Sequence, residues 1–189
     1  MRQSAAPFRR SAAAEALCAA MTGIGMEPAT FADLAAGRAL AASLIDPKIA
    51  DEEVLRAIHE RNGAGLHVLR EEGEVTGMLA LVLLNAAGLR ALCDNSFTPL
   101  APSLEHVAEL SEEPAAVYGW GSAASTRRAA AKVVLATATA CDTLPCPSFA
   151  RGTTDAGLHV LTRRLGMVPY PGSTMGLVWR PYPQARRAA

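Results

Sequence analysis

This 189-residue sequence lacks several features of composition that would point to a function. Its 18 basic and 18 acidic residues cancel, so no net charge attracts nucleic acid or an anionic membrane surface. The longest apolar run, residues 78–84, is far shorter than the ~20 residues of a membrane-spanning helix. We therefore expect no nucleic-acid or membrane partner, and we expect a cytoplasmic protein.

Paired metal ligands are also missing. The four histidines are scattered along the chain, and Cys141 and Cys146 have the wrong spacing for the usual zinc knuckle. The other two cysteines, Cys18 and Cys93, stand alone. We therefore predict no metal site and interpret all four cysteines as free thiols in a reducing compartment.

Apolar residues, by contrast, are plentiful. They make up 50% of the chain, which is enough to build a core and too many for a disordered protein. Lysine occurs only twice, so arginine supplies nearly all the positive charge, and alanine is very frequent. This bias is typical of a GC-rich bacterial genome, and the length fits one domain with a short arm.

The N-terminal 28 residues have the pattern of that arm. Arg2, Arg9 and Arg10 precede an alanine-rich stretch, an order that faintly resembles a targeting peptide, but Glu15 interrupts the apolar part. We predict a partly mobile extension over 1–28, helical at 12–21, followed by one folded domain over 29–189.

Changes between helical and extended periodicity divide this domain into elements. The expected helices cover 30–44, 51–62 (with a left-handed stop at Asn62-Gly63), 103–110, 126–142 and 153 or 154 to 165. The expected strands cover 65–70, 75–84 after a polar turn, 89–93, 115–120, 147–151, 167–170 and 174–180. This order predicts an α+β fold with a central mixed β-sheet flanked by helices.

The segment most informative about function is 118–131, a strand end, a glycine-containing turn over 121–125 and a helix start. Arg127 and Arg128 are unfavourable in a first helical turn unless an anion lies there, because that turn already carries a partial positive charge. We therefore predict a phosphate-binding site. The alternative is that both arginines are solvated, or paired with the acidic run at 109–113.

The same segment also fits a dinucleotide-binding pattern. Residues 119–124 match G-x-G-x-x-A, and Arg151 after the next strand would suit a 2′-phosphate. The match lies too late in the chain to leave room for two mononucleotide-binding halves. We therefore keep NADP as a distant alternative.

The end of the chain adds a resemblance to a known family. The run TDAGLHVLTRRLGMVPY at 154–170 is similar to the typical close of the GNAT superfamily of acyl-CoA-dependent N-acyltransferases, where a capped helix runs into Leu-Gly-Phe before a last hairpin. Met167 replaces the phenylalanine. With the order of elements, the resemblance covers about residues 30–180.

Two departures affect what the resemblance implies. The pyrophosphate motif of the superfamily, Arg or Gln followed by two residues, Gly, one residue and Gly or Ala, is degenerate at 126–132. Thr162 stands where the superfamily often has the tyrosine that protonates the departing CoA thiolate, and a threonine hydroxyl is too weak an acid for that role. The strand that opens the fold is also not evident before Thr30.

The resemblance implies transfer of an acyl group from acetyl-CoA or another acyl-CoA to an amine acceptor, a small molecule or a peptide, by direct attack. It implies these cofactor-binding residues: Trp120, Gly121, Thr126, Arg127, Arg128, Ala129, Ala130 and Ala131. His159 and Tyr118 are the catalytic candidates, with a surface histidine and a half-buried strand aromatic as the plain alternatives. The alternative function is a catalytically degenerate GNAT-like module for acyl-CoA binding or for dimerisation, in line with a homodimer.

Overall fold

The computed structural model describes residues 10–182, which form one mixed sheet with helices on both faces. The strands are β1 (Glu27–Pro28), β2 (Leu66–Glu71), β3 (Glu74–Leu84), β4 (Ala116–Ala124), β5 (Ser148–Arg151), β6 (Val168–Pro169) and β7 (Leu177–Arg180). The helices are α1 (Ala12–Gly23), α2 (Phe31–Leu44), α3 (Glu52–Arg61), α4 (Ala86–Cys93), α5 (Arg127–Thr143) and α6 (Asp155–His159), with short turns of other helix types at Leu104–His106 and Val160–Arg164. The predicted α+β class with a central mixed sheet is confirmed.

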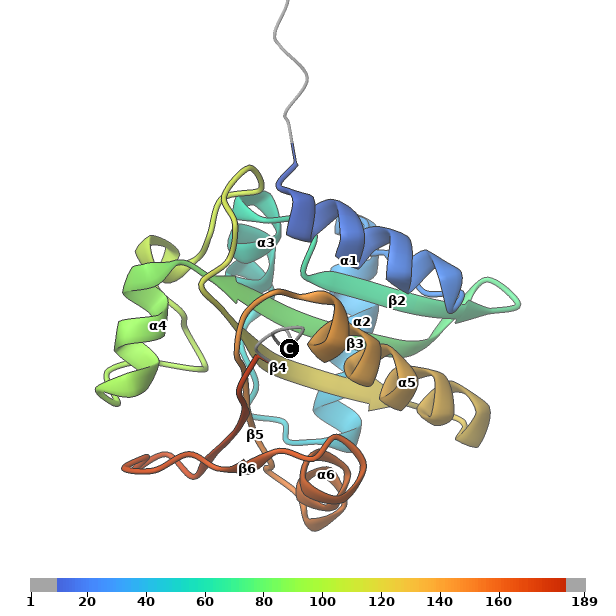
Figure 1. The fold of residues 1–189 in the computed structure, drawn as a ribbon. Helices are drawn as coiled ribbons and strands as arrows, with labels where there is room; N and C mark the ends of the chain where they lie inside the picture. The colour runs from blue at the N-terminus through green and yellow to red at the C-terminus, as the bar shows by residue number, and fades with distance from the viewer. Residues whose placement is uncertain (1–9, 183–189) are drawn as a thin grey trace, which may run out of the picture.

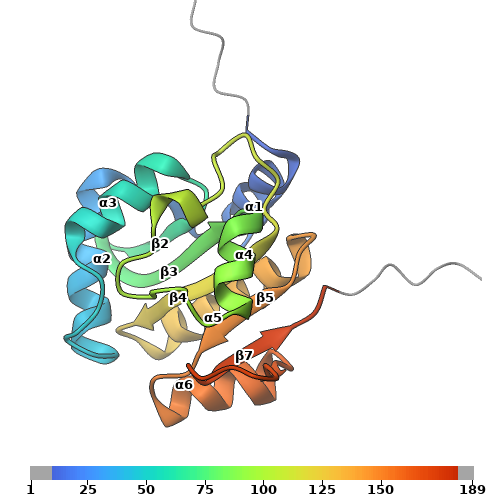
Figure 2. The same ribbon diagram turned by 90° about the vertical axis from the view of Figure 1, so that its left-hand side faces the viewer.

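The sheet order is β1-β2-β3-β4-β5-β7-β6. β4 and β5 are parallel, whereas the other neighbouring pairs in the described chain are antiparallel. Figure 1 shows α1 and α5 in front of the sheet and α2 behind it. We call the side covered by α1 and α5 the α5 face, and the side covered by α2, α3 and α4 the α2 face. Figure 2 shows α4 lying along the α2 face.

The β2–β3 hairpin forms as the sequence predicts. Glu72 and Gly73 form its two-residue turn with φ of 53° and 88°, the left-handed values that a tight hairpin needs. β3 is buried on both faces from Gly77 to Leu84, because α1 and α5 cover one side and α2 and α3 the other. The continuous apolar run in the sequence therefore marks a central strand.

The expected N-terminal extension differs from the structure over its described part. Residues 12–23 form α1, and Ala14, Leu17 and Met21 are each 0% exposed in a core cluster shared with α5. The Glu113 carboxylate accepts hydrogen bonds from the Ala12 and Ala13 amides at 2.8 and 3.3 Å. Residues 10–28 thus belong to the folded domain, while residues 1–9 lie outside the described part.

Four local predictions also differ from the structure. Residues 89–93 lie in α4 rather than a strand, because the Asn85 side chain caps it by accepting from the Ala87 and Gly88 amides, both at 3.0 Å. Residues 121–124 continue β4 instead of turning, since they pair with β3. The helix expected over 103–110 is a single 3₁₀ turn. α3 ends at Asn62 in an extended conformation with φ of −147°.

Candidate functional site

β4 and β5 run together for a short distance and then separate. Residues 117–119 of β4 are in register with 148–150 of β5, after which β4 pairs with β3 alone and β5 pairs with β7. The carboxyl ends of these parallel strands lie at one edge of the sheet, which is where open sheets of this kind bind ligands. We call this place, bounded by residues 120–124 and by Arg151, the strand divergence.

A β-bulge lies where the strand divergence begins. Gly121 is in register with Ala80 and Gly119 with Leu81, so Trp120 is an extra residue without a partner in β3. Bulges interrupt regular pairing and are frequent next to active sites. The backbone of Trp120 therefore takes no part in the regular β3–β4 register.

Trp120 and Gly121 both lie on the α2 face of the divergence. The half-buried Trp120 indole packs against the core clusters of that face, and its Nε1 donates to the Pro99 carbonyl at 2.6 Å. A Cβ placed on Gly121 would lie 4.0 Å from Cδ1 of Ile45, just beyond the end of α2. The wall on this side is thus aromatic and aliphatic.

The first turn of α5 follows directly from β4. Thr126 caps it, with Oγ1 accepting from the Ala129 amide at 3.0 Å, so the helix expected from residue 126 begins at Arg127. The Arg127 and Arg128 amides have no hydrogen-bond partner among residues 10–182, as is usual for a helix start. An anion at this turn would therefore meet two unpaired N–H groups, the helix dipole and two arginines.

The arginine side chains of this turn are accessible. Both Arg127 and Arg128 are exposed, and Arg128 comes no nearer than 3.9 Å to Glu71, with 80% of its own side chain exposed. Such a pair contributes little to stability. Pairing with the acidic run is ruled out for Glu109, which binds Arg61 at 3.1 Å, and for Glu113, which caps α1.

A shallow depression adjoins this turn. It is lined by Arg70, Glu71, Glu72, Glu74, Thr76, Thr126, Arg128 and Lys132. The hairpin residues reach α5 because Gly77 at the start of β3 is opposite Ala124 at the end of β4. Thr126 and Arg128 are expected here from the sequence. Lys132 and the hairpin residues are not, and the signal for them is the antiparallel register of the two long strands β3 and β4.

The three alanines predicted to bind a cofactor have different environments. Ala130 and Ala131 are exposed near the start of α5, in keeping with close approach of a ligand. Ala129 is 0% exposed and packs in the core on the α5 face, and its amide is bonded to Thr126. Ala129 therefore supports the helix start rather than presenting a surface.

Tyr118 lies in the core. It is 3% exposed, its ring centroid is 5.1 Å from that of Phe97, and burial raises the pKa of its phenol to about 12 in spite of the positive charge of Arg151. A buried phenol of this kind is a poor proton donor at neutral pH. Its catalytic role stays a prediction that its burial disfavours.

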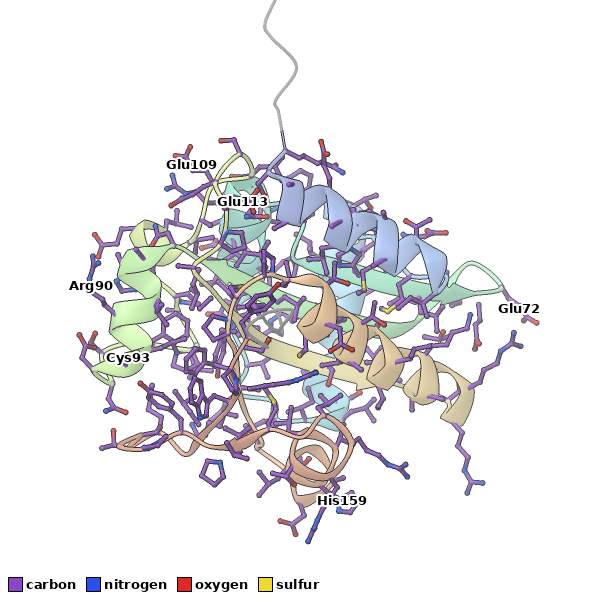
Figure 3. The ribbon with its side chains drawn as sticks, in the orientation of Figure 1. Glu72, Arg90, Cys93, Glu109, Glu113 and His159 are labelled. Carbon is purple, nitrogen blue, oxygen red and sulfur yellow. The ribbon has the colours of Figure 1, made fainter. Side chains whose placement is uncertain are left out.

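His159 and Thr162 lie away from Tyr118 in the fold. Figure 3 shows His159 on the outer side of α6, pointing away from the sheet, and its side chain is exposed. The Thr162 hydroxyl donates to the Leu158 carbonyl at 2.9 Å, back along its own helix. The structure therefore does not bring the two catalytic candidates together.

Comparisons with known proteins identify the class of fold. No family model and no curated protein matches the sequence significantly. Among solved structures, the loading GNATL domain of CurA from Lyngbya majuscula is similar with a TM-score of 0.56 at 12% identity, covering 83% of this chain and 96% of that one. The chain therefore has a GNAT-like fold, which confirms at the level of fold the resemblance found in the sequence.

Two further structures are similar at lower TM-scores. The GphF GNAT-like decarboxylase in complex with isobutyryl-CoA has a TM-score of 0.47 at 16% identity, over 76% of this chain and 72% of that one. A crystal structure of an acetyltransferase has a TM-score of 0.49 at 10% identity, over 84% of this chain and 99% of that one.

In the part of the chain that the structure describes, no helix is long and apolar enough to cross a membrane.

Proposed function

We propose that this chain binds an acyl-CoA at the strand divergence and transfers its acyl group to the nitrogen of an amine. The observation that carries the proposal is the first turn of α5, where unpaired amides and two exposed arginines follow directly from a strand that has just parted from its parallel neighbour. Phosphates bind to helix starts of this kind. The pyrophosphate would lie at Arg127 and Arg128, and the pantetheine arm along residues 120–124.

The bulge at Trp120 is the best place for the thioester. Backbone N–H groups near residues 118–120 would donate to the thioester carbonyl oxygen and stabilise the negative charge that it gains during attack. The amine nitrogen attacks the carbonyl carbon, the C–N bond forms and the C–S bond breaks. The proton that the amine loses ends on the departing CoA sulfur, so the products are an amide and CoA thiol.

A second candidate function is supported by a different observation. Tyr118 is buried, His159 is exposed on α6, and Thr162 is bonded to its own helix, so no predicted acid or base lies at the strand divergence. Positioning alone can accelerate the attack of a neutral amine, but the arrangement also fits an acyl-CoA-binding module without turnover. The two candidates share the CoA site and differ in chemistry.

Thermal unfolding with and without acetyl-CoA tests the shared part. A ligand at about 100 times its dissociation constant stabilises the folded state by ~2.7 kcal/mol, which raises Tm by several degrees for a domain of this size. We expect this shift with acetyl-CoA and not with NADP, and we expect its loss in Arg127→Glu/Arg128→Glu. The matched control is Arg163→Glu/Arg164→Glu, which reverses two adjacent exposed arginines in the turn after α6.

Release of CoA thiol in the presence of an amine panel then separates the candidates. Turnover that depends on the amine supports the acyltransferase, whereas a Tm shift without turnover on any amine supports the binding module. No shift with acetyl-CoA at millimolar concentration, or an equal loss of the shift in both double variants, would overturn the proposed site.

A further inference from the structure

Arg151 adds a positive charge to the strand divergence that is separate from Arg127 and Arg128 at the start of α5. It is the last residue of β5 and is in register with Leu177 of β7, so their side chains leave the sheet on the same face. Leu177 belongs to the core cluster of the α2 face, as does Phe149 two residues before Arg151. The Arg151 side chain therefore lies on the α2 face, where Trp120 lies on the other side of the strand divergence.

No acidic side chain neutralises this arginine. Arg151 is exposed, and no carboxylate of residues 10–182 lies within ion-pair distance of its guanidinium. The next acidic residue in the chain, Asp155, begins α6, and the helical turn that continues α6 packs through Val160 and Leu161 on the other face of the sheet. Arg151 directly follows Ala150, which pairs with Gly119 at the end of the β4–β5 contact, so it lies at the edge of the strand divergence opposite Trp120.

Trp120, across the strand divergence from Arg151, adds an apolar wall on the α2 face. The one donor of the Trp120 indole is occupied by the Pro99 carbonyl, so the indole presents only its apolar surface. The segment that carries Pro99 is held across this face, because Asn95 donates to the Gly172 carbonyl at 3.1 Å and accepts from the Thr174 amide at 2.8 Å. A group bound between Trp120 and Arg151 would meet the indole on one side and a cation on the other.

We propose that Arg151 binds a carboxylate carried by one of the two reacting partners, which makes the substrate class a carboxylate-bearing acyl-CoA or a carboxylate-bearing amine. A guanidinium binds a carboxylate through paired N–H donors in a fixed geometry. With the phosphates at the first turn of α5 and the thioester near the bulge, the acyl group and the amine are the parts of the substrates that reach Arg151. This assignment rests on the proposed function.

The experiment has two arms that separate the sources of the carboxylate. The acyl arm compares the calorimetric affinities of acetyl-CoA, malonyl-CoA and succinyl-CoA. The acceptor arm compares kcat/KM for amino acids with kcat/KM for the amines that lack only the carboxylate, at a fixed concentration of acetyl-CoA. Each arm uses the full chain, Arg151→Gln, Arg151→Lys and the control Arg90→Gln, which removes an exposed arginine that Figure 3 shows on α4 and pointing outward.

We expect the carboxylate-bearing partner to be preferred by roughly 10- to 100-fold in one arm, the range of a charged hydrogen-bonded pair. Arg151→Gln should abolish this preference and Arg151→Lys should keep part of it, whereas Arg90→Gln should keep all of it and leave the affinity for acetyl-CoA unchanged. Binding of acetyl-CoA without a preference in either arm, or a preference that survives Arg151→Gln, overturns the assignment and leaves the proposed function standing. If acetyl-CoA does not bind at all, the proposed function fails and the assignment fails with it.

Discussion

At the scale of single residues, His67 is a polar side chain buried without a hydrogen-bond partner in the described part of the chain. It is 0% exposed in β2, between Pro28 of β1 and Leu79 of β3, and neither ring nitrogen has a hydrogen-bond partner among the described residues. Burial, reinforced by the charge of nearby His59, lowers the pKa of His67 to about 4. Between these two pKa values, about 4 and the ordinary 6.5, the His67 imidazole is neutral in the folded chain and protonated in the unfolded chain.

This pKa predicts a loss of stability in mild acid. Between pH ~6.5, the ordinary value for histidine, and about 4, the unfolded chain binds a proton on His67 and the folded chain does not. The contribution of neutral His67 to the free energy of unfolding is therefore fully present above pH ~6.5. It falls by about 3 kcal/mol as the pH drops from ~6.5 to about 4. Urea unfolding at pH about 7 and about 5 measures this slope.

His67→Leu should remove most of that slope. A smaller slope remains, because partial burial also lowers the pKa of His59. His159→Leu is the matched control, since it removes an exposed histidine and should leave the pH dependence as it is in the native chain. A His67→Leu variant that loses stability in acid as steeply as the native chain would contradict the prediction.

At the scale of elements, the first turn of α5 is locally unfavourable in the absence of a ligand. Arg127 adds positive charge where the helix already carries a partial positive charge, and it has no ion pair within residues 10–182. Arg127→Glu should therefore raise the free energy of unfolding of the ligand-free protein by up to ~1 kcal/mol at low salt. Arg127→Gln should give about half of this gain, and added salt should reduce both gains.

Arg127→Glu should also weaken the binding of acyl-CoA, because it removes a positive charge from the proposed phosphate site. A variant that is more stable alone and less stabilised by acetyl-CoA would show that the arginine serves binding rather than folding. Chemical unfolding at low and at high salt, with and without acetyl-CoA, gives both quantities. Equal stability of Arg127→Glu and the native chain at low salt would contradict the electrostatic argument.

Elements with a strong local signal are predictable from this sequence, and elements fixed by pairing are not. The capping box of α2, the Glu72-Gly73 turn and the Thr126 cap each satisfy their own backbone within a few residues. In contrast, residues 121–124 have the composition of a turn but lie in β4, because β3 offers them a partner. The two-residue β1 has no local pattern at all and exists by pairing with β2.

The candidate site also contains both kinds of feature, those set by local sequence and those set by strand pairing. The helix start at residues 126–128 is a local feature and is found from the sequence. The bulge at Trp120 and the position of Arg151 opposite it depend on which strands are neighbours and in which register. Hydrophobic periodicity contains no information about that register across distant strands, so these parts of the site need the structure.

At the scale of the whole molecule, α1 closes the α5 face. Leu17 is 0% exposed in the cluster that joins α1, α5 and β3, although its segment has the composition of a terminal arm. Leu17→Ala should lower the free energy of unfolding by about 2–5 kcal/mol, as for other buried leucines. A mobile arm would tolerate the change without loss.

The control for this prediction is on the neighbouring helix. Leu135 of α5 is 51% exposed, so Leu135→Ala should change stability by less than about 0.5 kcal/mol. Urea unfolding of both variants measures the difference. Similarly small losses of stability in Leu17→Ala and Leu135→Ala would mean that residues 12–23 are an arm and not part of the core.

The short contact between β4 and β5 has a consequence for motion. Because 117–119 and 148–150 are the residues in register along this seam, the sheet consists of two hydrogen-bonded halves held together by a narrow join. We expect native-state hydrogen exchange to resolve them as separate cooperative units, with β5–β7 opening at lower free energy than β3. A ligand that spans the seam would hold the two halves together, so bound acyl-CoA should also slow exchange in β7, the strand next to β5.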